Sequence, residues 1–143
     1  MLTDHFLQMP GHHIRRAQQI STAYFTEELA DTELTSVQMV ALVVVADHPG
    51  IDATRLSEVI DIDRATIGGV VDRLERKGLI KRLVNKQDKR SKTIQATAAG
   101  KALLKVSLHK VERVQERLLA PLTPTERETF LHLIRTVIIG QIE

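Results

Sequence analysis

A mainly α-helical fold with one small β-hairpin is expected for this chain of 143 residues, on three grounds. Apolar residues make up 43% of the sequence but aromatic residues only 3%, so aliphatic side chains must form the core, as in packed helices. Helix-capping residues precede several segments whose apolar residues recur at helical spacing. Two strand-like segments occur once, on either side of a charged turn. The length suits one ordinary domain with one long appendage.

Start and stop signals define the expected helices. Pro10-Gly11 marks a break before the first helix. Thr35 and Gln38 fit a capping box, which favours a helix over the Val-rich segment that follows, although its composition would also suit a buried strand. Gly78 suits the left-handed residue that ends a helix. The tetrapeptide 123–126 places Thr at the cap, Pro at the first helical position and Glu at the third. The expected helices span residues 12–30, 39–46, 53–60, 64–77, 98–119 and 124–139.

The middle of the chain predicts a winged helix-turn-helix. Only two or three residues separate the helix over 53–60, which Asp52 can cap, from the helix over 64–77, which Asp63 can cap. Leu79–Val84 and Thr93–Ala96 are strand-like segments that flank a polar, charged hairpin tip. A hairpin placed directly after a helix-turn-helix is a wing.

Positive charge is concentrated in and just before this hairpin. The formal net charge of the whole chain is only +2, yet residues 76–92 carry +7 and the rest of the chain −5. Such a distribution is typical of a surface that binds a polyanion, although a solvated basic loop would look the same. The eight basic residues are Arg76, Lys77, Lys81, Arg82, Lys86, Lys89, Arg90 and Lys92.

A helical wheel divides the helix over 64–77 into an apolar face and a face of small residues. The side expected to meet the core holds Ile67, Val70, Val71 and Leu74. The opposite row holds Ala65, Gly69, Asp72 and Arg76, flanked by Thr66, Gly68 and Arg73. Two adjacent glycines cost a helix about 2 kcal/mol relative to alanines. They would let the backbone approach a DNA groove; a tolerated kink or a close helix crossing within the protein are the alternatives.

Four segments together resemble the MarR family of winged-helix regulators, and the likeness covers the whole chain. They are Asp63-Arg64-Ala65-Thr66, the decapeptide Val71–Ile80, Asp88-Lys89-Arg90-Ser91-Lys92 and Thr97-Ala98-Ala99-Gly100. The chain departs from the family pattern at Ala96, where a larger aliphatic residue is usual, and at Gly68-Gly69. The resemblance implies a homodimer, with residues 1–34 and 97–143 as a helical dimerisation region and residues 35–96 as the winged DNA-binding domain.

The resemblance also implies a site on double-stranded DNA. The recognition helix would enter the major groove, while Arg90 would enter the minor groove, oriented by Asp88. An arginine at a hairpin tip suits a narrow, electronegative minor groove. Small residues and methyl groups would meet the major groove, arginines would read guanine or bind phosphate, and lysines would bind phosphates. The expected DNA-binding residues are Arg64, Ala65, Thr66, Gly68, Gly69, Arg73, Lys86, Lys89, Arg90 and Lys92.

A small-molecule effector is expected as well, because MarR-like proteins often bind phenolic compounds or aromatic carboxylates near the dimer helices. Hydrogen-bond donors crowd the start of the first long helix, where an arginine could hold a carboxylate and a histidine could add a tunable donor. A solvated helix surface is the alternative. The candidate effector-binding residues are His12, His13, Arg16, Gln19 and Tyr24.

Enzymatic, metal-binding and membrane functions find no support in the sequence. The absence of Cys excludes disulfides, thiolate zinc sites and cysteine nucleophiles. No motif ties Ser21 to a base, and the adjacent His12 and His13 would point about 100° apart on a helix. The longest apolar run, Met39–Ala46, is far shorter than the roughly 20 residues that span a bilayer. No cofactor is expected.

The chain is therefore expected to be a cytoplasmic repressor that leaves a pseudo-palindromic operator when a small aromatic acid or phenol binds. One alternative is a winged-helix module that binds an acidic protein and no operator. A ligand-binding enzyme is the other.

Overall fold

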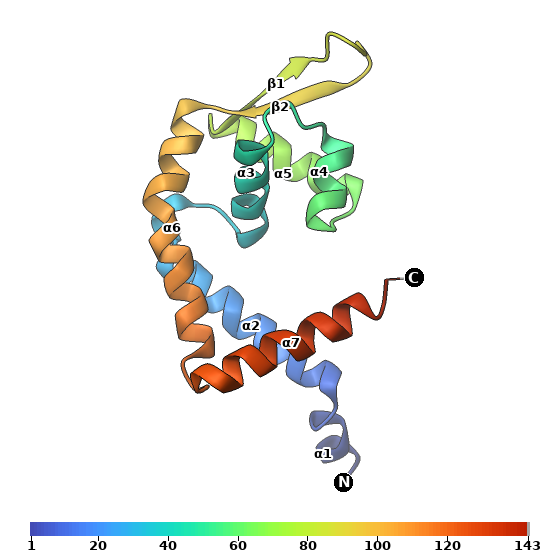
Figure 1. The fold of residues 1–143 in the computed structure, drawn as a ribbon, viewed down its shortest axis with the longest axis vertical. Coiled ribbons are helices and arrows are strands. Elements are labelled where there is room, and N and C mark those ends of the chain that lie inside the picture. Colours follow the sequence, from blue (N-terminus) through green and yellow to red (C-terminus); the bar gives the residue numbers. More distant parts are fainter. Residues whose placement is uncertain (143) are drawn as a thin grey trace. The chain divides into compact units, whose positions relative to one another are not determined.

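The computed structural model describes residues 1–142, which form two compact units (Figure 1). One unit comprises residues 25–111, and the other comprises residues 1–24 together with the residues from 112 onward. The elements are α1 (Leu2–Leu7), α2 (Pro10–Glu28), a 3₁₀ turn (Ala30–Thr32), α3 (Ser36–Asp47), α4 (Ala53–Ile60), α5 (Arg64–Arg76), β1 (Ile80–Val84), β2 (Lys92–Ala96), α6 (Ala98–Leu119) and α7 (Pro124–Ile139).

All six expected helices and both strands are confirmed, with shifts of a few residues at their ends. The first long helix begins at Pro10 rather than His12, because the missing N–H of a proline costs nothing in the first helical turn. The short helix α1 was not expected; its six residues bury no side chain and so carry no amphipathic pattern. The Val-rich segment is helical, as its capping box predicts.

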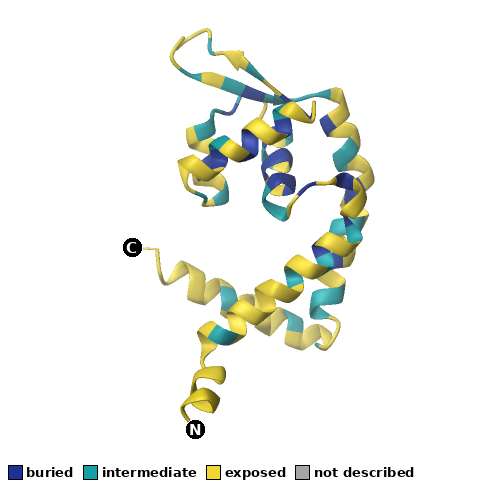
Figure 2. Ribbon diagram, turned by 180° about the vertical axis from the view of Figure 1, so that it is seen from behind, coloured by how far each residue is buried: buried dark blue, intermediate teal, exposed yellow. Residues whose placement is uncertain are grey.

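The unit of residues 25–111 holds the main hydrophobic core. In Figure 1 the hairpin of β1 and β2 extends across one end of the group formed by α3, α4 and α5. The strands are antiparallel, with Ile80 opposite Ala96 and Val84 opposite Lys92, and Ile51 bridges to Ile94. Figure 2 shows buried residues concentrated in these elements. The most buried large side chains of this unit are Leu29, Leu42, Val45, Leu56, Ile67, Val71, Leu74, Ile80 and Ile94.

Side-chain caps fix where the helices of this unit begin. The Thr35 hydroxyl accepts a hydrogen bond from the Gln38 N–H at 3.2 Å, and the Gln38 side chain accepts one from the Thr35 N–H at 3.1 Å. The Asp63 carboxylate accepts from both the N–H and the hydroxyl of Thr66, at 2.9 and 2.7 Å. These two bonds hold the pKa of Asp63 below its usual value, so the carboxylate that starts α5 stays ionised.

The first turn of α6 packs directly on the backbone that follows α5. The Thr97 hydroxyl donates to the Gly78 carbonyl at 2.6 Å, and the Thr97 N–H donates to the Leu79 carbonyl at 3.0 Å. Gly78 has φ +72°, as the sequence predicts for a residue that ends a helix. A Cβ at Gly100 would overlap the carbonyl oxygen of Leu79 and lie 3.3 Å from Leu42 Cδ1. Only glycine permits this approach of α6 to the end of α5.

The other unit contains α1, most of α2, the C-terminal part of α6 and α7. Arg127 of α7 forms an ion pair with Glu116 of α6 at 3.0 Å, and its Nε donates to the carbonyls of Leu119 and Leu122 at 3.1 and 3.2 Å. These bonds fix the turn between the two helices. Most apolar side chains of the unit are exposed in the single chain, including Phe6, Ile14, Leu133, Val137 and Ile138.

We expect Gly100→Ala to lower the free energy of unfolding by about 1–3 kcal/mol, because its methyl group overlaps backbone that cannot move aside freely. Gly68→Ala is the matched control, since a Cβ at that position meets nothing within 4 Å and alanine favours a helix by about 1 kcal/mol. Chemical denaturation of both variants checks this. Equal stability of the two would show that α6 does not depend on the contact with Leu79.

Candidate nucleic-acid interface

Helix α5 presents to solvent the face that the helical wheel predicts. Its apolar side chains Ile67, Val70, Val71 and Leu74 are all buried, and they fix the rotation of the helix. The opposite row is exposed, and so are Arg64, Thr66 and Arg73, while Gly68 is half-buried. Every candidate DNA-binding residue on α5 therefore lies on or beside the outward face.

The paired glycines leave open space on this face. A Cβ built at Gly68 or Gly69 meets no atom within 4 Å, so no other helix crosses here. The alternative of a close helix crossing within the protein is therefore wrong. Helix α5 also runs through the pair without interruption. The space beside the glycines is open to an external surface, and the backbone is the part of α5 that such a surface would meet.

A hollow of about 540 Å³ separates the N-terminal half of α5 from the wing, the hairpin of residues 80–96. Arg64, Ala65 and Gly68 line one side of it. The wing residues Arg90 and Lys92 line the other side. The first turn of α4 completes the wall with residues 52–54, which the sequence analysis did not include in the site. Five of the ten candidate DNA-binding residues thus meet around one concavity.

A second hollow, of about 320 Å³, includes Thr66, Gly69 and Arg73 of α5. Its remaining residues are Val70 of α5 and Thr35, Val37 and Gln38 at the start of α3. Because each hollow includes a different set of α5 residues, the exposed face of α5 is flanked by two concavities. Lys86 and Lys89 line neither hollow and lie in the hairpin tip between β1 and β2.

The hairpin tip is closed by its own polar groups. The Asn85 N–H donates to the Ser91 carbonyl at 3.1 Å, and the Arg90 N–H donates to the Asp88 carboxylate at 3.0 Å. Asp88 therefore holds the backbone of Arg90 rather than its guanidinium. Among the described residues no acid pairs with that guanidinium, and the side chain is exposed. Arg90 is thus presented on an ordered turn with its charge unneutralised.

Arg82 of β1 pairs with two acids of α5, which the count of basic residues did not anticipate. Its guanidinium binds the carboxylates of Asp72 at 2.7 Å and Glu75 at 2.9 Å, both on α5. The Glu75 carboxylate also accepts from the Arg82 N–H at 3.2 Å. Arg82 counts toward the positive charge of residues 76–92, but two acids of α5 already pair with it. These bonds join the wing to α5.

Protonation does not loosen this joint at neutral pH. The Arg82 hydrogen bond is the main reason why the pKa of Glu75 lies below its usual value of 4.5. A lowered carboxylate pKa stabilises the folded state above pH 4.5, and that stabilisation is lost as the pH falls through the folded-state pKa. The joint between wing and helix is accordingly intact throughout the physiological range.

The candidate effector-binding residues do not form one cluster on α2. Arg15 Nη2 lies 3.0 Å from His12 Nδ1, and Arg16 Nη1 donates to the Gln19 side chain at 2.6 Å. Partial desolvation and the charge of Arg15 lower the pKa of His12, so it is neutral at pH 7 and can accept the bond from Arg15. Arg15 was not among the candidates, although its i, i+3 spacing from His12 pointed to the contact.

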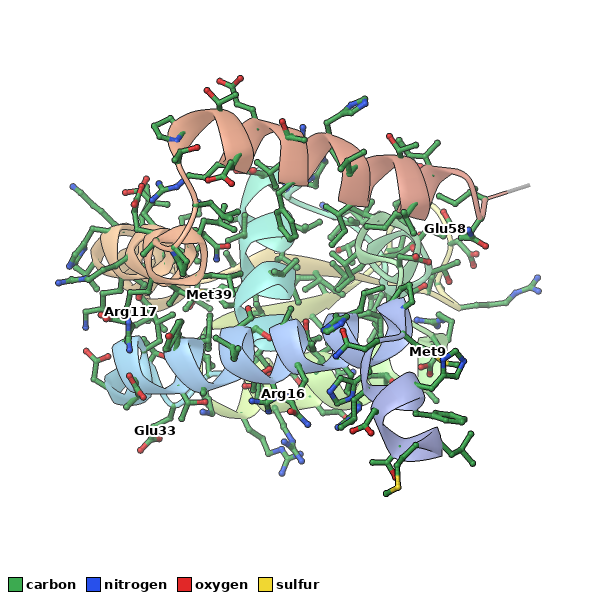
Figure 3. The ribbon with its side chains drawn as sticks, turned by 90° about the horizontal axis from the view of Figure 1, so that it is seen from below. Met9, Arg16, Glu33, Met39, Glu58 and Arg117 are labelled. Carbon is green, nitrogen blue, oxygen red and sulfur yellow. The ribbon has the colours of Figure 1, made fainter. Side chains whose placement is uncertain are left out.

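Tyr24 belongs to a different environment. The Arg117 guanidinium of α6 lies 4.0 Å from the centroid of its ring, a cation–π contact. Figure 3 labels Arg16 and Arg117, which lie beside different stretches of α2. Tyr24 follows Arg16 by eight residues, about 12 Å along the helix axis. The structure thus brings Arg16 and Gln19 together but keeps Tyr24 apart from them.

Within residues 1–142, no group of three or more His, Cys, Asp or Glu side chains is arranged to hold a metal ion. None of the helices described above is both long and apolar enough to cross a membrane.

Substitution of Arg82 tests whether it positions the wing. We expect Arg82→Gln to weaken DNA binding about tenfold, or about 1.4 kcal/mol, with only a small loss of thermal stability because the ion pairs are partly exposed. Arg82→Lys keeps the charge but cannot bridge two carboxylates with a planar fork, so it should remain impaired. Fluorescence anisotropy with labelled duplex DNA measures both. If Arg82→Lys bound DNA as tightly as the parent protein, the positive charge of Arg82 would be sufficient and its planar guanidinium would not be needed.

Comparison with known proteins agrees with this geometry. Residues 34–92 match the sequence profile of the MarR family. The HTH-type transcriptional repressor NicR of Pseudomonas putida is 33% identical over 128 residues, which cover 90% of this chain and 81% of NicR.

Two solved structures are also similar. The first is that of Bordetella bronchiseptica BpsR, whose DNA binding is regulated by 6-hydroxynicotinic acid; it has a TM-score of 0.87 and 29% identity, covering 92% of this chain and 94% of BpsR. The second is the PcaV transcriptional regulator of Streptomyces coelicolor with its natural ligand; it has a TM-score of 0.87 and 32% identity, covering 94% of each chain. The fold, the outward face of α5 and these similarities together show that the chain belongs to the MarR family of transcriptional regulators.

Proposed function

We propose that this chain acts in the cytoplasm as a homodimeric repressor that binds a pseudo-palindromic DNA operator and is released from it by a small aromatic carboxylate or phenol. The observation that carries the DNA-binding part is the exposed face of α5, which holds paired glycines and is flanked by two hollows. A convex helix with a bare backbone fits a major groove about 12 Å wide, and the unpaired Arg90 fits the adjacent minor groove.

The exposed apolar surface supports the homodimer. Helix α7 buries no side chain in the single chain, and Val137, Ile138 and Ile139 are each more than half exposed. An exposed row of apolar side chains is stabilised by packing against another apolar surface, and the same helices of a second copy of the chain supply one. We therefore assign residues 1–34 and 97–143 to dimerisation and residues 35–96 to DNA binding. A two-fold dimer would present two α5 helices to half-sites about 34 Å apart.

Arg90 should contribute more to operator binding than a lysine of the same hairpin tip. Arg90→Ala is expected to weaken specific binding by tenfold or more, since a guanidinium in the minor groove loses its water and reads groove shape. Lys86→Ala is the matched control. It should reduce the slope of log binding constant against log salt concentration by about one, and by the same amount for every DNA sequence. Operator fragments selected from genomic DNA provide the ligand for titration at several salt concentrations. If Arg90→Ala lost the same affinity for specific and for random DNA, Arg90 would only contact phosphate, as the lysines are expected to do.

Gly69→Leu tests the close approach of α5 to DNA. The new side chain enters open space and a glycine is removed from a helix, so the melting temperature should stay the same or rise. Operator affinity should fall at least a hundredfold, because the leucine holds the helix away from the base edges. Thermal denaturation and operator titration together separate the two effects. Normal operator binding by this variant would refute the close-approach argument and leave the glycines unexplained.

Similarity to BpsR, whose DNA binding is regulated by 6-hydroxynicotinic acid, supports an aromatic acid as the effector, and similarity to PcaV, which was solved with its natural ligand, supports control by a bound ligand. A ligand releases DNA only through its difference in affinity for the two states of the protein. A coupling of about 1–3 kcal/mol would weaken operator binding roughly 5- to 150-fold. On α2, the Arg16 guanidinium beside Gln19 offers a planar donor pair for a carboxylate.

Arg16→Ala should leave operator affinity unchanged without a ligand and abolish release by an aromatic acid. Benzoate, salicylate and nicotinate, added to the operator-bound protein, are the probes, and the neutral amide of an active acid is the control for charge recognition. Competition measured by fluorescence anisotropy gives the midpoint of release. Release of DNA from the variant at the parent midpoint would show that Arg16 and Gln19 form only a solvated surface pair.

A further inference from the structure

The second hollow described above, of about 320 Å³, lies between α5 and the start of α3. The two helices lie side by side within the unit of residues 25–111 (Figure 1). Thr66 and Gly69 line the hollow and are exposed, as is Arg73. Because these residues also belong to the outward face of α5, DNA bound to that face would cover the hollow.

The hydroxyl group of Thr66 is held within the cap of its own helix. It donates to one oxygen of the Asp63 carboxylate at 2.7 Å, while the other oxygen of Asp63 accepts from the Thr66 N–H at 2.9 Å. The hydroxyl proton is therefore not available to an acceptor on a base edge. The methyl group branches from the same Cβ in another direction, so the group that Thr66 can offer to DNA is apolar. Val70 and Val37 add further apolar atoms to the wall of the hollow.

Space for a partner of this methyl group lies next to Thr66 on the helix. Gly69 follows Thr66 by three residues, a spacing that makes the two positions neighbours on the helix surface. A Cβ at Gly69 would meet no atom within 4 Å. Every residue other than glycine would place a carbon atom in that space, so the sequence keeps a volume of at least one methyl group open there.

One base carries a group that matches this combination. In the major groove, guanine, adenine and cytosine present hydrogen-bond donors and acceptors, whereas thymine also presents its 5-methyl group. Contact between two methyl groups removes apolar surface from water and needs no hydrogen bond. An apolar side chain beside open space on the DNA-facing helix therefore favours thymine.

We propose that Thr66 determines operator specificity through its methyl group, which packs against the 5-methyl group of one thymine in each half-site, in the space beside Gly69. This proposal rests on the proposed operator binding and adds the chemical group that is recognised at one position. Thr66 thus distinguishes thymine from uracil, two bases with the same hydrogen-bonding groups.

Replacement of each operator thymine in turn by deoxyuridine tests this on the full-length protein. The probe is a duplex selected from genomic DNA, titrated by fluorescence anisotropy. At one position of each half-site, uracil should weaken binding by the contribution of one buried methyl group, about fourfold for one half-site and about fifteenfold for both. Substitutions of Thr66 then show whether this residue is the partner of the missing methyl group.

Thr66→Ser keeps the hydroxyl and removes the methyl group, so it should bind the thymine operator more weakly and lose no further affinity when uracil is introduced. Thr66→Val keeps a methyl group and removes the hydroxyl, so it should retain the uracil effect. Thr54→Ser is the matched control: it removes a methyl group from the hollow beside the wing, and the uracil effect should persist.

The outcomes separate this proposal from operator binding itself. If an operator is bound but Thr66→Ser shows the same uracil effects as the parent, the role of the Thr66 methyl group is refuted and operator binding stands. If Thr66→Val loses the uracil effect while Thr66→Ser keeps it, the hydroxyl is the recognised group and the proposal is refuted. If no sequence is bound more tightly than random DNA, both operator binding and this proposal are refuted.

Discussion

The two ion pairs between Arg82 and helix α5 govern how the DNA-facing surface is built. A two-stranded hairpin has little stability of its own, and its direction depends on what holds its base. Here one guanidinium binds Asp72 and Glu75 on successive turns of α5, and the backbone N–H of the same residue also donates to Glu75. The hollow between α5 and the wing has Arg64 on one side and Arg90 on the other, and Arg82 itself contributes to its wall.

The basic residues of this short stretch of sequence therefore have different roles. Arg82 is half-buried and paired with two acids, and its bonds hold the wing against α5. Arg90, by contrast, keeps its full charge because Asp88 bonds to its backbone and leaves the guanidinium free. The lysines of the tip lie beyond both hollows, where they can contact phosphates without constraining the helix. A count of basic residues treats these roles as equal, whereas the hydrogen bonds separate them.

Local signals in the sequence were sufficient for every helix except α1 and for the face of α5. Capping residues such as Thr35 and Asp63, together with apolar spacing, depend on neighbours within four positions, and each proved accurate. The role of Arg82 depends on partners seven and ten residues earlier across a turn, a spacing that matches no periodicity. Alternation along β1 did carry a usable signal, since it places Arg82 on the same side of the strand as the buried Ile80. Ser107 of α6 is buried and its hydroxyl has no hydrogen-bond partner among the described residues; this could not be predicted from sequence, because only the packed structure shows that the hydroxyl is enclosed.

The paired glycines have a further effect on the dynamics of α5. Glycine gains more backbone freedom than any other residue when a helix opens, and two in succession weaken the hydrogen-bonded turns around them. The turns around the glycines are held on one side by Ile67 and Val70 and are open on the other, so we expect them to open to solvent more readily than the buried turns of α3. A DNA groove that encloses this stretch must also order it, which weakens binding to every sequence by the same entropic term. Because that term is common to operator and random DNA, it lowers both affinities without changing their ratio, and discrimination is left to the contacts that base edges make with the bare backbone.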